Sequence, residues 1–214
     1  MKYTITILIV MFLLALVSSA AGQAVAKENG YKLMPGTETP AFKKSSDGEM
    51  CLVFREYIVK TSQRRDTGEN VTVYKREASA IAESACKETG SSYFDTESSD
   101  QFFFGLSGSL LFVNKDSSVE PYRDLTIYNL KTREWLTEET YTGEPKLVDG
   151  RFVVFDSDSD KRGEEKTCKD YAKWISEDLS ITWVQGKKLD LQTLKVSNVG
   201  GLRCLSYRLR IPGA

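Results

Sequence analysis

The sequence predicts an α+β protein made mainly of antiparallel, sandwich-like β-sheet, with two amphipathic helices that disulfides staple to the sheet. The first observation is a series of short apolar runs separated by Gly, Asp, Asn and Pro, which is typical of strands and turns. The second is helical periodicity in two separate stretches. The third is a set of four cysteines, one in each helical stretch and one in a strand elsewhere in the same half of the chain.

We expect a signal peptide over residues 1–26. A charged start, an apolar run from Ile5 to Val17 and small residues up to Ala26 follow in the order that export requires. An uncleaved membrane anchor is the alternative, because roughly 20 apolar residues span a bilayer, but the Ser- and Ala-rich end favours cleavage after residue 21 or, preferably, 26. The cleavage zone has no nearby cysteine to which a lipid could be attached, so we do not expect a lipoprotein. The expected product is exported and soluble, periplasmic or extracellular, without stable membrane insertion.

Composition excludes several classes of function. The balance of 29 Lys and Arg against 30 Asp and Glu gives no electrostatic footprint for nucleic acid. The chain has no histidine, so neither Ser-His-Asp nor Cys-His catalysis can operate, and histidine-ligated zinc is excluded. Hydrolysis by paired carboxylates remains open, because it needs only Asp and Glu. We expect a protein without a cofactor.

The mature chain is predicted to consist of an extended lead-in over residues 27–49 and one disulfide-braced domain over residues 50–214. The lead-in contains three turn-forming pairs of residues, Pro35-Gly36, Thr39-Pro40 and Asp47-Gly48. A strand from Leu52 to Val59 and a second from Val71 to Tyr74 follow, and the polar turn between them indicates a hairpin.

Two amphipathic helices are predicted. The first has apolar side chains at i, i+3, i+4, i+7 and i+8, and Gly90 follows as a stop signal. These side chains belong to Ala78, Ile81, Ala82, Ala85 and Cys86. The second helix starts near Thr167, which forms a capping-box pair with Asp170. Its predicted inner face consists of Cys168, Tyr171, Ala172, Ile175 and Leu179.

Between and after the helices the pattern predicts strands. They cover residues 102–104, 110–113, 125–130, 152–155, 181–184, 188–191 and 202–211. Leu130-Lys131-Thr132 and Leu191-Gln192-Thr193 look alike, and each closes a strand. Two copies with a helix between them do not make a repeat array, so we interpret them as hairpins.

Cys51, Cys86, Cys168 and Cys204 are the only cysteines, and no Cys-x-x-Cys motif occurs. Four cysteines in an exported chain imply two disulfides with three connectivities. We favour Cys51–Cys86 and Cys168–Cys204, which pair near neighbours within each half of the chain. Each bond would then join a predicted helix to a strand.

Alternating carboxylates at Asp156, Asp158 and Asp160 have the spacing of a calcium loop. An EF-hand needs Gly at position 6 and Glu at position 12, and neither residue stands there. A looser calcium site that adds Glu164 or Glu165 is the alternative to a solvated acidic loop, which we favour.

A carboxylate pair for hydrolysis has three weak candidates, Glu138, Glu139 and Asp149. Adjacent residues on a strand point to opposite faces, so Glu138 and Glu139 would not act together. Nothing else in the sequence fixes two carboxylates at the separation that glycoside hydrolysis requires.

Residues 107–126 contain Ser107-Gly108 and, after a strand and a polar loop, Tyr122-Arg123. This arrangement resembles the periplasmic inhibitors of invertebrate-type lysozyme. That family carries a Ser-Gly-x-Tyr motif and a Tyr-Arg-x-x-Ala motif a short loop apart on a β-rich scaffold, and it uses them to plug the lysozyme's active-site cleft. Ser107-Gly108 and Tyr122-Arg123 match these motifs, whereas Leu110 replaces the Tyr and Thr126 replaces the Ala.

The resemblance implies a partner-binding loop formed by Ser107, Gly108, Tyr122 and Arg123. The Arg123 guanidinium would bind the catalytic carboxylates of a lysozyme bidentately, with the Ser107 hydroxyl as a second donor. The alternative is that Ser107-Gly108 is a plain turn and Arg123 a surface residue. The inhibitor hypothesis requires Ser107 and Arg123 to project from one loop edge.

We therefore expect an exported, soluble, non-enzymatic binding protein of the cell envelope, with a lysozyme-like or other secreted hydrolase as its partner. Two alternatives remain open: a secreted hydrolase that uses Asp and Glu alone, and a structural or interaction protein of the envelope.

Overall fold

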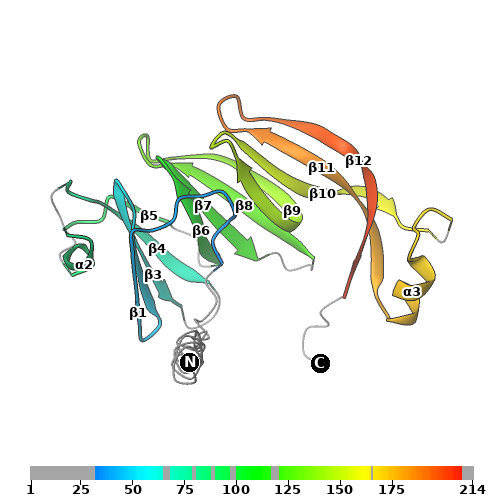
Figure 1. Ribbon diagram of the computed structural model, residues 1–214, viewed down its shortest axis with the longest axis horizontal. Helices are drawn as coiled ribbons and strands as arrows, with labels where there is room; N and C mark the ends of the chain where they lie inside the picture. The colour runs from blue at the N-terminus through cyan, green and yellow to red at the C-terminus, as the bar shows by residue number, and fades with distance from the viewer. Residues whose placement is uncertain are drawn as a thin grey trace, which may run out of the picture. The chain divides into compact units, whose positions relative to one another are not determined.

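Two antiparallel β-sheets make up the fold (Figure 1). The computed structural model describes residues 32–64, 68–78, 81–87, 90–96, 100–116, 121–164 and 166–208, except for the side chains of residues 116, 160 and 161. The predicted signal peptide lies outside the described residues. The compact unit that contains both sheets begins at Leu33.

The first sheet has five strands in sequence order, each antiparallel to the next. They are β1 (Phe42–Ser46), β2 (Glu49–Val53), β3 (Tyr57–Gln63), β4 (Glu69–Lys75) and β5 (Phe94–Asp95). The β3–β4 pair confirms the predicted hairpin. The single strand predicted from Leu52 to Val59 is wrong, because the chain turns at residues 54–56 and continues as β3.

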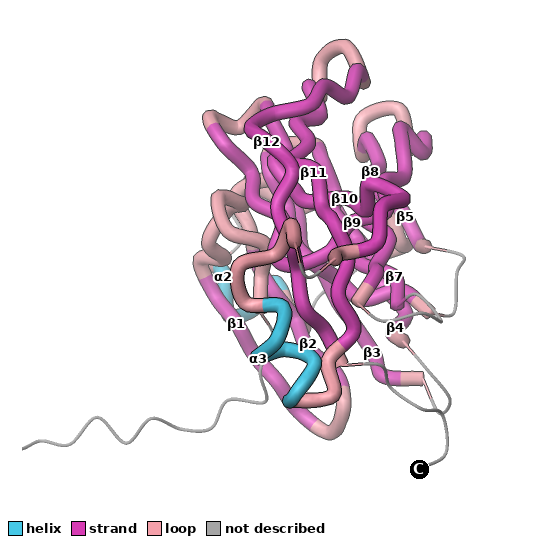
Figure 2. The backbone as a smooth tube through the Cα atoms, turned by 90° about the vertical axis from the view of Figure 1, so that its right-hand side faces the viewer, coloured by secondary structure: helices cyan, strands magenta, loops and turns pink. Residues whose placement is uncertain are grey.

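The second sheet has seven strands, also in sequence order. Figure 2 shows that strands make up most of the described backbone. They are β6 (Gln101–Ser107), β7 (Leu110–Asp116), β8 (Tyr122–Asn129), β9 (Glu134–Val148), β10 (Phe152–Arg162), β11 (Ser180–Asp190) and β12 (Lys195–Tyr207). The two short strands predicted at 181–184 and 188–191 form one strand, β11.

The long strand β9 has no counterpart among the predicted strands. Its sequence contains Gly143 and Pro145, which ordinarily argue against a central strand. Val154 of β10 pairs with Lys146 and Asp156 pairs with Thr142, so two steps along β10 match four along β9. Gly143 and Pro145 lie within this bulge, and Gly143 has a φ of 76°. The bulge therefore lets β9 keep partners on both sides.

The predicted lead-in is part of the fold. Asp47 and Gly48 have φ angles of 47° and 82° and connect β1 to β2, and two successive positive φ angles are the signature of a tight hairpin turn. The predicted boundary between residues 49 and 50 therefore falls inside a β-hairpin.

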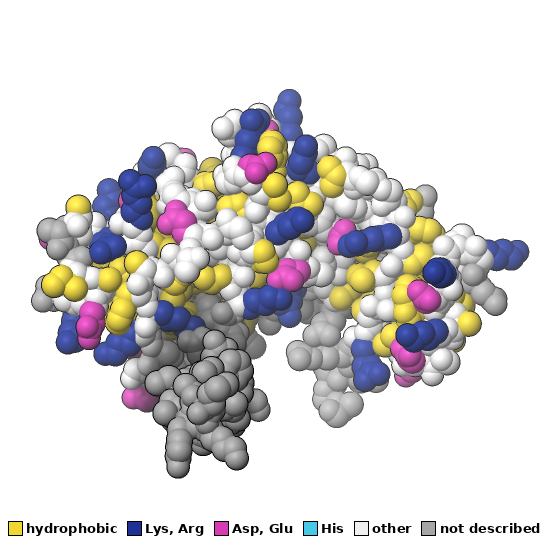
Figure 3. All heavy atoms as spheres, in the orientation of Figure 1, with side chains coloured by type: hydrophobic (Ala, Val, Ile, Leu, Met, Phe, Trp, Pro, Cys, Tyr) yellow, Lys and Arg dark blue, Asp and Glu magenta, His cyan; other side chains and the backbone are white. Residues whose placement is uncertain are grey.

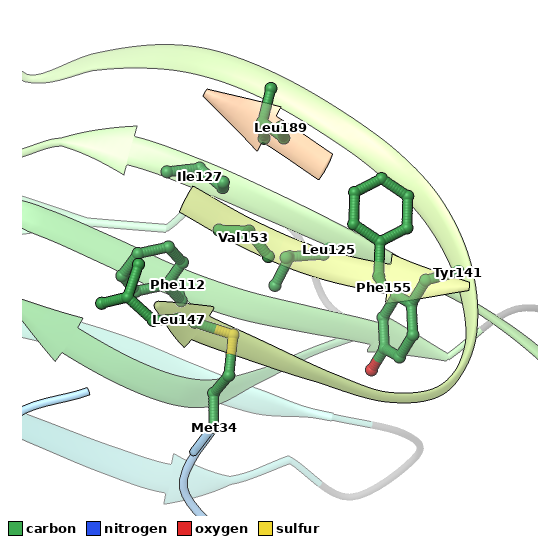
Figure 4. Close-up of a cluster of buried hydrophobic side chains, with 9 residues drawn as sticks. All are labelled: Met34, Phe112, Leu125, Ile127, Tyr141, Leu147, Val153, Phe155 and Leu189. Atoms are coloured by element: carbon green, nitrogen blue, oxygen red, sulfur yellow. The ribbon is translucent and has the colours of Figure 1, made fainter. Parts of the chain in front are cut away.

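Met34 is anchored against the seven-stranded sheet. Its side chain is 1% exposed and packs with Phe112 and Leu147 in a buried cluster (Figure 4). Its N–H donates to the carbonyl of Phe104 at 2.7 Å, and the N–H of Glu38 donates to that of Leu106 at 2.8 Å. The segment therefore binds the edge of β6 and also fills the core.

The two sheets also contact each other. The Phe54 and Phe103 rings lie 6.0 Å apart in an edge-to-face arrangement, and the Phe103 N–H donates to the Glu69 carboxylate at 3.4 Å. Phe94 of β5 and Tyr128 of β8 have ring centroids 5.2 Å apart. Aromatic pairs of this geometry contribute beyond the area they bury.

Both helices are shorter than predicted, and their amphipathic character is not confirmed. Helix α2 spans Ala82–Ala85, with Ile81 75% exposed before it. Helix α3 spans Tyr171–Ser176 and has no buried residue. The Thr167 hydroxyl donates to the Glu164 carbonyl, so it closes a turn before the helix and does not cap it. Helices this short depend on tertiary contacts, because one or two turns are marginal in water.

The disulfide pairing is confirmed as Cys51–Cys86 and Cys168–Cys204. Cys86 is the C-cap residue of α2, so the first bond joins a helix end to β2. Cys168 lies in the turn before α3, so the second bond joins that turn to β12.

The two similar leucine-containing segments confirm the hairpin interpretation, since they form the β8–β9 and β11–β12 turns. Each turn opens with a side-chain oxygen, from Asn129 or Asp190, that accepts a bond from the N–H two residues on. In the part of the chain that the structure describes, neither helix has the length and apolarity needed to span a bilayer.

We expect Met34→Ala to lower the free energy of unfolding by about 2–5 kcal/mol, because it removes a fully buried side chain from the main core. Denaturant unfolding would measure the loss, with the exposed Thr39→Ala as control. An unchanged midpoint for Met34→Ala would show that the segment is dispensable.

We expect the paired substitution Cys51→Ala/Cys86→Ala to lower the free energy of unfolding by about 3–4 kcal/mol, because the bond closes a loop with a sequence separation of 35. Reversible urea unfolding under oxidising conditions would test this value. The corresponding pair Cys168→Ala/Cys204→Ala, with a separation of 36, should lose a similar amount. Loop entropy is not the main contribution if the two losses differ several-fold.

Candidate functional site

The structure does not bring the four predicted partner-binding residues together. Ser107 ends β6 and pairs with Leu110, at the start of β7. Arg123 on β8 pairs with Asp116, at the other end of β7. Six steps along a strand at ~3.4 Å each separate these two positions by roughly 20 Å. Ser107 and Arg123 therefore do not project from one loop edge.

Each half of the predicted motif has its own surroundings. Gly108 turns the chain from β6 into β7, and its N–H donates to the Glu38 carboxylate. Tyr122 and Arg123 open β8, where successive side chains point to opposite faces of the sheet. Tyr122 lines a cavity.

The acidic residues Asp156, Asp158 and Asp160 lie on strand β10, so the predicted acidic loop is wrong. Strand β11 pairs with Asp156 and Asp158, and β9 pairs with Asp156, so this part of the stretch is held extended. Among the described side chains, no group of three or more acidic residues or cysteines is placed to hold a metal ion. The Asp160 side chain lies outside the described part.

The proposed carboxylate pair also fails to form. Glu138 accepts a hydrogen bond from the Thr126 hydroxyl at 2.8 Å, and Glu139, its neighbour on β9, has a pKa raised by burial. Asp149 lies in the β9–β10 turn, beyond the far end of β9. The three carboxylates do not converge.

A cavity of about 610 Å³ lies where β8, β10, β11, β12 and α3 meet, and we call it the tyrosine groove. Its residues share an amphipathic character, with three tyrosines, three aliphatic side chains and a few polar groups. They are Tyr122, Tyr171, Tyr207, Ile175, Leu179, Ile181, Asp158, Thr182, Ser180, Arg162 and Gly163. A cavity that combines aromatic and aliphatic side chains with a few convergent polar groups is a candidate ligand site.

The polar centre of the groove is Asp158. Its Oδ2 accepts a hydrogen bond from the Tyr122 hydroxyl, and its Oδ1 accepts one from the Thr182 hydroxyl, both at 2.9 Å. Tyr122 and Asp156 both pair with Thr142 of β9, so the tyrosine reaches across that strand to β10. Strand register therefore builds this cluster from residues far apart in the chain.

Burial raises the pKa of Tyr122 to about 12, with further contributions from the hydrogen bond to Asp158 and from its charge. The phenol therefore stays protonated and donates to the carboxylate. The ring of Tyr207, at the end of β12, has its centroid 6.4 Å from that of Tyr122. A perturbed titratable group beside a carboxylate in a cavity is a mark of functional sites.

Two carboxylates on the same face of β10 have different partners. Asp156 forms an ion pair with Arg203 of β12. Within the part of the chain that the structure describes, Asp158 has two hydroxyl donors and no ion pair. Arg162 lines the same cavity from the end of β10. The groove therefore holds a carboxylate whose charge is not matched by a bonded cation.

The walls of the groove depend on the second disulfide. Cys168, which is 3% exposed, links the turn before α3 to Cys204 on β12. The helix that follows presents Ile175, which is 51% exposed, at the cavity. Figure 1 shows α3 beside the ends of β11 and β12. Because α3 has no buried residue, the Cys168–Cys204 disulfide helps to hold this short helix at the groove.

Comparisons with protein-family models, with curated proteins and with solved structures found no match to this chain. The groove is thus defined by its geometry alone. The sequence indicates Tyr122 through the inhibitor-like motif and Asp158 through the spacing of a calcium loop. No motif in the sequence indicates Thr182 or Tyr207 as a site residue. The usable signal was the alternation on β10, which places Asp156 and Asp158 on one face of a strand.

We expect Tyr122→Phe to lower the free energy of unfolding by about 1–3 kcal/mol at neutral pH, because it removes a hydrogen bond to a carboxylate. A raised folded-state pKa stabilises the fold below the unfolded pKa and loses that effect as pH rises through the folded value. The difference from wild type should therefore shrink between pH 10 and 12. Urea unfolding across that range would measure it, with Tyr171→Phe as the control. A difference that does not change with pH would contradict the role of the Tyr122 proton.

Proposed function

We propose that the chain is an exported, non-enzymatic binding protein of the cell envelope that takes a cationic ligand in the tyrosine groove. One observation carries the ligand class: the carboxylate of Asp158 lies among tyrosines, is held by two hydroxyl donors and has no bonded cation in the described structure. A buried or half-buried charge of this kind is stabilised by a partner of opposite sign.

The chemistry of the groove fits an ammonium or guanidinium group attached to an apolar body. The faces of aromatic rings attract cations within about 6 Å of the ring centroid, and the groove contains Tyr122, Tyr171 and Tyr207. The apolar part of the ligand would lie against Ile175, Leu179 and Ile181. Tyr122 and Thr182 fix the carboxylate in place before binding, which lowers the ordering cost.

Binding is favoured over hydrolysis by the composition of the groove. Glycoside hydrolysis needs two carboxyl groups, one on each side of the scissile bond. Among the described lining residues, the acidic side chain is that of Asp158, and both its oxygens already accept hydrogen bonds.

Export is supported by the apolar N-terminal sequence and by two disulfides that brace the fold. Disulfides of this kind persist in oxidising compartments, such as the periplasm or the extracellular space. The proposal does not rest on the motif resemblance, because the register of β7 separates Ser107 from Arg123. A secreted hydrolase would act as partner through a lysine or arginine side chain placed in the groove.

Titration of the mature protein with choline and benzyltrimethylammonium, followed by calorimetry, tests the ligand class. We expect saturable binding, tighter for the benzyl compound because of the apolar wall. Asp158→Asn should weaken binding by about tenfold or more, because it removes the charge that the ligand pairs with.

Asp149→Asn is the matched control, since it removes the same charge from the β9–β10 turn, outside the groove. Its affinity should equal that of wild type. No binding of either cation by wild type, or equal binding by Asp158→Asn, would refute the proposal. Binding of an uncharged oligosaccharide in place of the cations would also refute the ligand class.

A further inference from the structure

A second surface shares no described lining residue with the tyrosine groove. In it, basic side chains surround a pair of aromatic rings. We call it the Tyr93 patch. It consists of Arg55, Lys75, Arg76, Lys131 and Arg133 around Tyr57 and Tyr93. The basic residues come from the β2–β3 turn, the end of β4 and the β8–β9 turn, so both sheets contribute. On the face drawn in Figure 3, lysine and arginine side chains are spread over both sheets.

Tyr93 is the fixed centre of the patch. The Lys75 ammonium lies 4.5 Å from its ring centroid and the Arg133 guanidinium 4.3 Å from it. The Tyr57 ring lies 6.1 Å away. A hydrogen bond from Arg133 to the phenol oxygen lowers the pKa of Tyr93, and Lys75 adds to this effect. The ring therefore holds two long basic side chains in defined positions.

Two cavities meet at Tyr93. One, of about 720 Å³, is lined by Arg55, Arg76 and Lys131 in addition to Lys75. The other, of about 420 Å³, is lined by Arg133 and by several serines. Lys75 and Tyr93 belong to both linings, so they form a common wall between two adjacent hollows.

The charge of these hollows contrasts with that of the whole chain. Among the described lining residues, five are basic and two, Glu56 and Glu77, are acidic, whereas the whole chain carries a net charge of −1. Positive potential is therefore concentrated in this part of the surface, and clefts that carry one sign of charge attract ligands of the other sign.

We propose that the Tyr93 patch binds a linear anionic glycan, with successive sulfate or phosphate groups on either side of Tyr93. Arginine and lysine bind such groups through charge-assisted hydrogen bonds. Ser91 and Ser92 line the smaller cavity, and serine hydroxyls can hydrogen-bond to the hydroxyls of a sugar. This binding goes beyond the function proposed for the tyrosine groove and does not depend on it.

A glycan fits this surface better than a nucleic acid. Proteins that hold single-stranded nucleic acid stack the bases on aromatic rings. Here Lys75 and Arg133 already lie over the Tyr93 ring, so it is not free to stack on a base. What remains for a ligand is the outward charge of the basic side chains, which suits a polymer recognised by its anionic groups.

The experiment measures binding of the mature protein to immobilised heparin, with uncharged dextran and single-stranded oligothymidine as comparison probes. Wild type should bind heparin in a salt-dependent manner and should not bind dextran. Lys75→Gln/Arg133→Gln should weaken heparin binding by about tenfold or more, because two charge-assisted contacts are lost.

The control Lys44→Gln/Lys87→Gln also removes two positive charges, but from a separate cavity of about 530 Å³ on the five-stranded sheet. It should leave heparin binding within about twofold of wild type, since exposed charges elsewhere act weakly. If Lys75→Gln/Arg133→Gln does not fold, Arg55→Gln/Lys131→Gln tests the same surface through two exposed side chains.

Three outcomes would overturn the proposal. If the wild-type protein does not bind heparin, the proposed glycan site does not exist. An equal loss in the patch and control variants would assign binding to overall charge. Oligothymidine binding as tight as heparin binding would assign the patch to nucleic acid.

Discussion

Burial of one face of the seven-stranded sheet is the constraint on which the rest of the structure depends. A sheet built from neighbouring antiparallel strands has an apolar face that must be covered and edges that must be paired or protected. The segment around Met34 meets both needs, because its side chain enters the main core while its backbone binds the edge of β6. The five-stranded sheet adds the aromatic contact of Phe54 with Phe103.

Local patterns predicted much of the β-structure, because within each sheet every strand pairs with its neighbour in sequence. The disulfide pairing also followed from proximity along the chain. The differences have physical causes. The Gly143–Pro145 bulge hides β9 in the sequence pattern, and the Asp47-Gly48 turn joins β1 to β2 although few apolar residues precede it. The helical periodicity around Ile81 competed with a fold in which one turn of helix suffices before the Cys86 crosslink.

The candidate site could be predicted only in fragments. Tyr122 was selected through a motif and Asp158 through its spacing, but the motif paired Tyr122 with residues at the far end of β7. Its true neighbours, Asp158 and Thr182, follow from the register of β8 to β11. Register across four strands depends on every turn and bulge between them, which a sequence pattern does not specify.

Each disulfide closes its loop within one sheet and its adjoining helix, and neither crosses to the other sheet. A protease cut inside residues 51–86 or 168–204 would therefore leave both fragments covalently joined. A cut between residues 87 and 167 would leave two separately crosslinked halves that only non-covalent contacts hold together. In a protease-rich environment, the durability of the chain thus depends on how well the strands β5 to β10 resist local opening.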